Sequence, residues 1–281
     1  MEGNKLILMI QWSKREGNAI VLNDYPQDLF SEEFIDDYLQ KVYNEQITDR
    51  DLDLKYHKTV GGELYEGAAF GFGGHVDTWP DVTKLGECIE GIRDNCYIFS
   101  AAKQYQQVRE MSDFILDNGV KSSWADFKKK AHTVFDEYNV NYLKTEYNTA
   151  VGQAQMARDW VQFELESDLF PFLTYQTQHD QRVRDAHAMI NGVTRPVKDS
   201  FWTYYMPKNG WNCRCFVTSH QHATVTKIPK GIPRWGSPEF PEVFKMNPGK
   251  DKMIFKKDHP YFEVAKGDKG FKKKNFGLPI P

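Results

Sequence analysis

Residues 171–180, PFLTYQTQHD, mark the point at which the pattern of the chain changes. The run FLTYQ after Pro171 is short and rich in residues that favour strands. Thr177 then supplies an N-cap, and an acid follows three residues later, where its carboxylate can reach back to the cap. We therefore predict a strand and then a helix that begins at Thr177 and ends at Asn191-Gly192. This helix would carry Asp180, Val183, Arg184, His187 and Met189.

The residues beyond this helix predict a small sheet. The aromatic-rich runs FWTYY and RCFVT are separated by Pro207 and by an Asn-Gly pair, a pattern typical of short strands joined by turns. Together with the helix they predict an α+β module over residues 169–228. We expect its core to consist of Val183, Met189, Phe201, Trp202, Trp211 and Phe216.

The chain before Pro171 has the spacing of helices. Ser31 is followed by two acids and by apolar residues at positions 34, 35, 38, 39 and 42, which predicts one capped amphipathic helix. Residues 67–74, GAAFGFGG, lack the lysine of a phosphate-binding loop and are interpreted as a flexible loop. Cys88 and Cys96 share an apolar helical stripe and are expected in the core.

These patterns predict an α+β protein in which a mainly helical N-terminal part precedes a small module with short strands. We divide the chain into four parts. They are an N-terminal extension with one amphipathic helix and a glycine-rich loop (1–80), a helical scaffold (81–168), the α+β module (169–228) and an extended basic arm (229–281).

Composition excludes several classes of protein. The chain has 281 residues, 40% of them hydrophobic, which is enough apolar material for a packed core. Its formal net charge of −3 argues against a uniformly basic nucleic-acid-binding protein, and no run of 18 apolar residues predicts a membrane span. The first residues lack a small-residue cleavage site, and the chain has four cysteines, so we expect a protein of a reducing cytoplasm.

Positive charge is concentrated near the C-terminus. Residues 250–274 contain nine lysines and four acids, a local net charge of +5 in a chain of total charge −3. Such a segment is either a solvated surface of the same domain or an arm that contacts DNA or an acidic partner. The candidate contact residues are Lys250, Lys252, Lys256, Lys257, Lys272, Lys273 and Lys274.

Cys213 and Cys215, in the stretch NCRC, are spaced so that both sulfurs face one side of an extended chain. Three interpretations stay open. Zinc would need further ligands, and the candidates are His187, His179, His220 and His222. Alternatively, the thiols pack as small apolar groups under Trp211 while Arg214 pairs with Asp180 or Asp185. The third interpretation, a disulfide between the two cysteines, would close a strained ring.

An enzymatic alternative depends on the predicted helix. At intervals of four and three residues, Asp180, Arg184 and His187 would share one helical face, as in a nuclease-like or nucleotide-transferase effector. The same three residue types also arise from a helix-dipole acid, a salt-bridged arginine and a core histidine. No nucleophile motif accompanies them, and we expect a protein that is not an enzyme.

The order and spacing of several residues resemble the Mu F-like minor head protein family of tailed bacteriophages. The residues that carry the resemblance are Thr177, Asp180, Val183, Arg184, His187, Gly192, Pro207, Trp211 and the unit Asn212-Cys-Arg214-Cys. The preceding stretch 142–150, YLKTEYNTA, is similar to the helix that leads into this module in members from Bacteroides phages and prophages. One departure is GlyTrpAsn before CysArgCys, where many members carry a histidine.

The resemblance implies a minor head protein, made in the cytoplasm of a bacterial host and present in the virion head. It implies a role in head morphogenesis near the portal, with the portal and the major capsid or scaffold proteins as partners. It also implies association with packaged DNA. From the residues themselves we expect no contact with a membrane and no cofactor, and zinc stays open only through Cys213 and Cys215.

Overall fold

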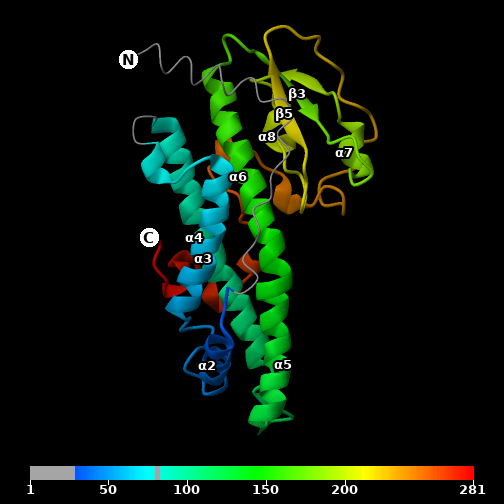
Figure 1. Ribbon diagram of the computed structural model, residues 1–281. Helices are drawn as coiled ribbons and strands as arrows, with labels where there is room; N and C mark the ends of the chain where they lie inside the picture. The colour runs from blue at the N-terminus through cyan, green and yellow to red at the C-terminus, as the bar shows by residue number, and fades with distance from the viewer. Residues whose placement is uncertain (1–28, 80–82) are drawn as a thin grey trace.

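The computed structural model describes residues 29–79 and 83–281 and has an elongated helical body with a small sheet module beside one end (Figure 1). None of the helices in the described ranges is both long and apolar enough to cross a bilayer. The helical body contains α2 (Glu32–Tyr43), α3 (Leu54–Phe72), η1 (Val76–Thr78), α4 (Thr83–Ser112), α5 (Trp124–Asp136), the π-helical turn η2 (Glu137–Tyr142) and α6 (Leu143–Leu165). A two-stranded hairpin, β1 (Leu116–Asp117) and β2 (Val120–Lys121), joins α4 to α5.

Helix α2 begins where the sequence predicts it. The Ser31 side chain accepts a hydrogen bond from the backbone N–H of Phe34 at 3.2 Å, which caps one of the unpaired amides of the first turn. The five apolar positions of the predicted stripe are all buried. The prediction for this segment is confirmed, although the residues before position 29 lie outside the described part of the chain.

The predicted loop at residues 67–74 is wrong, because residues up to Phe72 belong to helix α3. The glycines serve close contact between helices. A Cβ atom at Gly71 would lie 2.0 Å from the carbonyl oxygen of Val151 in α6, and one at Gly67 would lie 2.7 Å from the ring of Tyr147. Only at Gly73, where φ is +88°, does the chain use glycine to end the helix.

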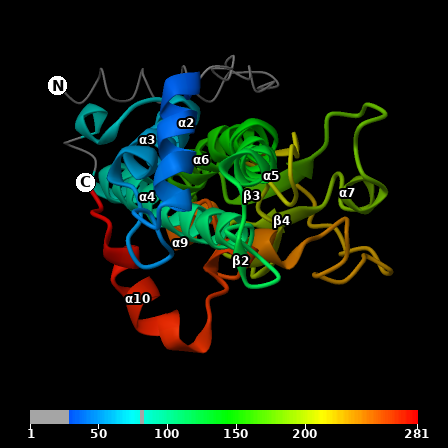
Figure 2. The same cartoon turned by 90° about the horizontal axis from the view of Figure 1, so that it is seen from below.

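Helices α3, α4 and α6 pack along one another and form the body seen from below in Figure 2. The apolar stripe that carries Cys88 and Cys96 belongs to one 30-residue helix, α4, in which both cysteines are fully buried, as predicted. Burial raises the pKa of the Cys88 thiol to about 12, so this cysteine is an inert core residue.

The module is built on a three-stranded antiparallel sheet of order β4-β3-β5. The central strand β3 (Phe172–Gln176) pairs with β4 (Thr194–Pro196) and with β5 (Phe216–His220). Two short helices, α7 (Asp185–Met189) and α8 (Phe201–Tyr205), complete it. The prediction of an α+β fold with a helical N-terminal part is confirmed, but FWTYY forms helix α8 instead of a strand.

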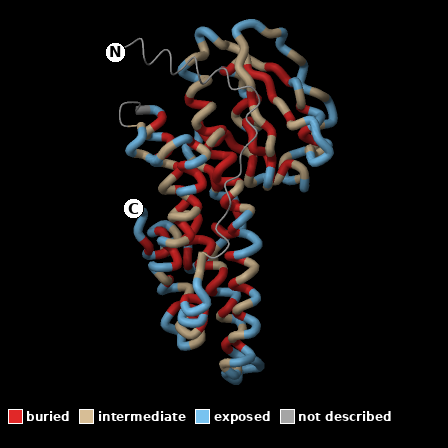
Figure 3. Tube along the Cα trace, in the orientation of Figure 1, coloured by how far each residue is buried: buried red, intermediate tan, exposed pale blue. Residues whose placement is uncertain are grey.

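The described residues form two hydrophobic clusters. We call the cluster of α2 to α6 the scaffold core and the cluster of the sheet module the module core. Helix α6 contributes to both, because Ala150 and Val151 lie in the first while Met156 and Trp160 lie in the second. Figure 3 shows buried residues both in the helical body and in the sheet module.

The composition of the module core differs from the prediction. Phe201 and Trp202 are buried there, and Phe216 packs against it partly buried. Trp211 is half-buried and packs edge-on against Phe244 and His259 outside this core. The other two predicted members also differ, since Val183 is half-buried and Met189 is 38% exposed.

The predicted helix from Thr177 is also wrong at its start. Residues 177–184 form an irregular loop, and helix α7 begins only at Asp185. Asp180 accepts a hydrogen bond from the amide of Arg182 at 3.0 Å, so its carboxylate stabilises a local turn instead of a helix N-terminus. The predicted stop at Gly192 is present, with φ at +76°.

The C-terminal segment is not an extended arm. It contains η3 (Glu242–Phe244), α9 (Pro248–Asp251), η4 (Pro260–Phe262), η5 (Lys266–Asp268), α10 (Lys269–Lys273) and η6 (Asn275–Gly277). Its aromatic residues explain the difference, because Phe255, Tyr261, Phe262 and Phe276 are buried in the scaffold core. The lysines therefore lie on a segment that is docked on the body of the same chain.

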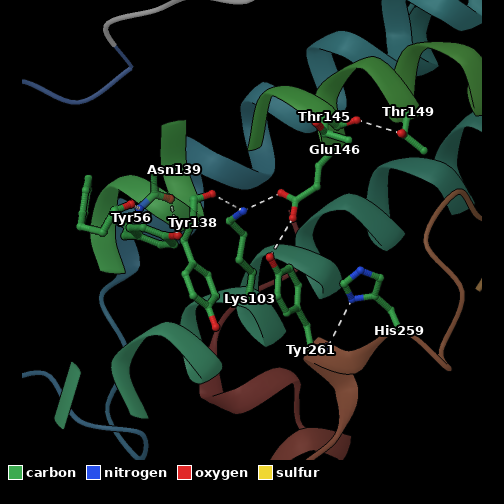
Figure 4. A network of polar contacts seen from close by, with 10 residues as sticks. Tyr56, Lys103, Tyr138, Asn139, Thr145, Glu146, Thr149, His259 and Tyr261 are labelled. Carbon is green, nitrogen blue, oxygen red and sulfur yellow. Dashed lines mark hydrogen bonds and ion pairs between the residues drawn. The ribbon is translucent and has the colours of Figure 1, made fainter. Parts of the chain in front are cut away.

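A buried polar network joins this segment to the scaffold (Figure 4). The ammonium of Lys103 donates 2.6 Å hydrogen bonds to the carbonyl of Tyr138 and to the carboxylate of Glu146. The other oxygen of Glu146 accepts from the hydroxyl of Tyr261 at 2.9 Å. Every member is buried, so the ion pair is enclosed and has its hydrogen bonds made.

Candidate functional site

The module encloses a cluster of one imidazole and two thiols. Nδ1 of His187 lies 3.6 Å from the Sγ atom of Cys213 and 3.7 Å from that of Cys215. These three atoms all lie within 4.8 Å of one another, and all three residues are buried. Helix α7 supplies the histidine, and the segment just before β5 supplies the cysteines.

The surrounding backbone fixes this arrangement. Nε2 of His187 is 3.1 Å from the carbonyl oxygen of Glu239, which can only accept, so Nε2 carries the proton and Nδ1 presents its lone pair to the sulfurs. The imidazole also stacks on Phe240, with ring centroids 5.0 Å apart. Asn212, at φ +55°, turns the chain into the cysteine segment.

The two thiols have different acidities. Burial disfavours ionisation of Cys213, but the hydrogen bond from the Cys215 thiol and the nearby charge of Lys208 act in the opposite direction, and the pKa of the Cys213 thiol is lowered. The hydrogen bond to Cys213, together with burial, raises the pKa of the Cys215 thiol.

Lys208 lies beside the cluster and was not recognised from the sequence. Its ammonium is buried and donates a 2.8 Å hydrogen bond to the carbonyl oxygen of Cys215. Its backbone is held by Gln153 of α6, through bonds of 3.1 and 3.3 Å. A lysine next to Asn-Gly is typical of an exposed turn, so the sequence carries no signal for its burial.

The other histidines named in the sequence do not join the cluster. Nε2 of His220 lies 3.0 Å from the Thr218 hydroxyl oxygen in β5, and both His179 and His222 are exposed. Trp211 packs elsewhere, so the interpretation that the thiols lie under this indole is wrong. The ion pair between Arg214 and Asp180 is present at 2.6 Å.

The remaining motif residues stabilise the loops around the cluster. The amide and the hydroxyl of Thr177 donate to the side-chain oxygen of Asn191, at 2.9 and 3.2 Å, and the amide of Gly192 donates to the carbonyl of Tyr175. Arg184 donates to the carbonyl of Trp211 at 2.7 Å. Pro207 is buried at the end of the segment that follows α8.

Asp180, Arg184 and His187, the three residues of the predicted nuclease-like or transferase-like site, do not come together in the structure. Because residues 177–184 are not helical, Asp180 and Arg184 do not share a helical face with His187. Asp180 is exposed and pairs with Arg214, and the hydrogen bond from Arg214 lowers the pKa of its carboxyl group. His187 instead faces the two thiols, so the predicted acid, cation and imidazole arrangement is wrong.

The seven candidate lysines fall into two groups. Lys250 lies 4.6 Å from the Trp160 ring centroid, Lys252 pairs with Glu87, Lys256 pairs with Asp258, and Lys272 donates to the carbonyl of Phe262. The other three, Lys257, Lys273 and Lys274, are exposed. These three are the lysines best placed to meet an external anion.

Comparison with known proteins identifies the class to which this region belongs. Residues 101–218, from the middle of α4 to β5, match the family model described as Phage Mu protein F like protein. The match covers less than half of the chain and contains the whole His187, Cys213 and Cys215 cluster.

One relative is the putative capsid assembly protein F of Escherichia phage Mu. The two chains are 34% identical over 86 residues, which is 31% of this chain and 20% of protein F. The match thus spans about a fifth of the length of that relative. No solved structure matches. The resemblance to members from Bacteroides phages stays a prediction.

Proposed function

We propose that this chain acts in the assembly of a phage head, as a minor head protein near the portal. The observation that carries the proposal is the Mu F-like region over residues 101–218, together with the relative named a putative capsid assembly protein. The proposal places the protein in the virion head, with the portal and the major capsid or scaffold proteins as partners.

The architecture suits a role in assembly. The matched region runs from the scaffold into the module, and both cores are tied together by α6. The scattered polar residues of the enzymatic alternative offer no equivalent support. We therefore favour a structural role over a nuclease-like or transferase-like activity.

The direct test is mass spectrometry of purified virions produced from the phage or prophage that encodes this chain. We expect the protein in the heads at a copy number far below that of the major capsid protein. A deletion of the gene should give defective heads, and expression of the chain in trans should restore them. Normal infectious virions without the protein would overturn the proposal.

We further propose that the exposed lysines of the C-terminal segment contact packaged DNA by charge alone. Lys257, Lys273 and Lys274 are exposed on a segment of local charge +5, and α10 lies at the outer edge of the body in Figure 2. Lysine side chains neutralise phosphates without reading base edges.

A salt titration of duplex binding tests this contact. Replacing these three lysines with glutamine should weaken binding and reduce the log-log salt slope by about 2 to 3, since each phosphate contact contributes about 0.9. The control replaces Lys58, Lys129 and Lys144, which are exposed on α3, α5 and α6, and changes the net charge equally. Equal slopes for both triple variants would remove the DNA role and leave the head-assembly proposal untouched.

A further inference from the structure

We propose that His187, Cys213 and Cys215 bind one zinc ion through Nδ1 and the two Sγ atoms, with a water molecule as the fourth ligand. The ion would join helix α7 to the segment that leads into β5. Nothing in the head-assembly proposal requires it, and it is argued from the geometry of the three side chains.

The two distances from the imidazole nitrogen to the sulfurs match those of a tetrahedral zinc site. Zinc lies about 2.3 Å from a thiolate sulfur and about 2.0 to 2.1 Å from an imidazole nitrogen, which places sulfur and nitrogen about 3.5 to 3.6 Å apart at tetrahedral angles. The observed separations from Nδ1 of His187 are 3.6 Å to Cys213 and 3.7 Å to Cys215. Since the three ligand atoms all lie within 4.8 Å of one another, one ion can contact all of them.

Hydrogen bonds among the three residues explain the two nearly equal nitrogen–sulfur distances less well than a bound cation does. The neutral imidazole has one lone pair at Nδ1, which can accept one S–H donor, yet both sulfurs lie at nearly the same distance from it. A cation between the three atoms would be contacted by all of them. Two thiolates and one imidazole are also a donor set that zinc prefers.

The second contact of the histidine is the one typical of a metal ligand. Metal-bound imidazoles usually donate their other N–H to a carbonyl or carboxylate, which fixes the ring. Here Nε2 of His187 donates to the carbonyl of Glu239 at 3.1 Å, and the ring stacks on Phe240. The ligand nitrogen is thus oriented toward the sulfurs before any ion binds.

The cluster also has room for a fourth ligand. A cavity of about 20 Å³ adjoins the three side chains and is lined further by Gln178, Arg184 and Asn212. About 10 to 15 Å³ is enough for one water molecule. Among the described residues no fourth histidine, cysteine or carboxylate joins the group, so a water in this cavity completes the tetrahedron.

Metal content of the purified full chain, expressed without a histidine tag, tests the site. We expect about one equivalent of zinc, and less than about one-tenth of an equivalent in Cys213→Ser and in Cys215→Ser. The matched control is Cys88→Ala, which removes a buried thiol from α4 and should keep the full equivalent.

Two further measurements separate loss of metal from loss of folding. A strong chelator should lower the melting temperature of the unaltered chain, and added zinc should restore it, because metal affinity adds to folding free energy. Cobalt in place of zinc should give thiolate-to-metal charge-transfer absorption. Zinc below about one-tenth of an equivalent in the unaltered chain, with no response to chelator or cobalt, would overturn the proposal.

Discussion

Lys103 in the scaffold and Lys208 in the module are both enclosed by protein, but their charges are compensated in different ways. Lys103 has a carboxylate partner in Glu146, which is itself bonded to Tyr261. Lys208 donates to a carbonyl oxygen, and the groups whose negative charge would favour its ammonium form are the thiols of Cys213 and Cys215 and, after them, the carboxylate of Asp159. Burial lowers the pKa of both ammonium groups.

The two lysines show that the scaffold core and the module core compensate a buried positive charge with different groups. The scaffold network contains its own counter-charge, because the ammonium of Lys103 and the carboxylate of Glu146 form an ion pair at 2.6 Å. The polar centre of the module depends on thiols, whose charge changes with ionisation or with a bound cation. Substitutions in each core can measure this difference.

The largest effect is expected when the scaffold ion pair is broken. Lys103→Met leaves the buried carboxylate of Glu146 without its cation and should cost about 3 to 5 kcal/mol of unfolding free energy. Urea denaturation at pH 7 measures this cost. The exposed pair of Lys41 and Asp37 serves as the control, where Lys41→Met should cost less than about 1 kcal/mol.

The double variant Lys103→Met/Glu146→Gln sharpens this result. It removes both charges but keeps an oxygen that accepts from the Tyr261 hydroxyl. More than half of the lost stability should return, because no unpaired charge stays buried. A double variant as unstable as Lys103→Met would show that packing, not charge, sets the cost.

The next effect concerns the pH dependence of the scaffold. Burial and the charge of Lys103 lower the pKa of His259 to about 4, and the neutral ring accepts a hydrogen bond from the amide of Tyr261. As pH falls below about 6.5, the unfolded chain takes up a proton that the folded chain does not, so stability falls until about pH 4. Between pH 7.5 and pH 5, His259 alone should lower the free energy of unfolding by about 2 kcal/mol.

His259→Asn keeps an acceptor near the Tyr261 amide but cannot titrate in this range. Denaturation curves at pH 7.5 and 5 should therefore show a smaller difference for this variant than for the unaltered chain. The control is His222→Asn, since His222 is an exposed histidine and its replacement should leave the difference unchanged. If His259→Asn retained the full pH dependence, the buried neutral imidazole would not be its source.

The smallest effect is expected at the second lysine. Lys208→Met removes one hydrogen bond to the carbonyl of Cys215, but it also removes a desolvated cation that has no carboxylate partner among the described residues. The two contributions oppose each other, and we expect a net cost of about 1 kcal/mol. The measurement is made in excess chelator, so that both proteins are free of metal. If Lys208→Met lost as much unfolding free energy as Lys103→Met, the two buried lysines would not differ in how their charges are compensated.

Periodic patterns gave reliable predictions where local chemistry controls the structure. Helix α2 begins at its serine cap, Cys88 and Cys96 lie in the core of α4, and strand β3 follows Pro171. In each case the signal lies within a few neighbouring residues. The cap, the apolar stripe and the run of strand-favouring residues act through contacts between near neighbours in the sequence.

The predictions that were wrong concern features that depend on contacts between residues far apart in the sequence. The carboxylate of Asp180 bonds to Arg214, 34 positions away, and the aromatic residues of the C-terminal segment are buried against α4 and α6. At the candidate site, the sequence identified both cysteines and included His187 among several histidines. It could not select His187 over His220, because the fold alone brings α7 beside the segment before β5.

Helix α3 carries a consequence for the order in which the protein folds. It contains four glycines within 19 residues, and each costs a helix about 1 kcal/mol relative to alanine. As an isolated segment α3 would therefore be mostly unstructured, whereas α6 has fewer glycines and several alanines. Helix α3 should form only as it docks, with Gly67 and Gly71 allowing the approach to a surface that α6 has already presented.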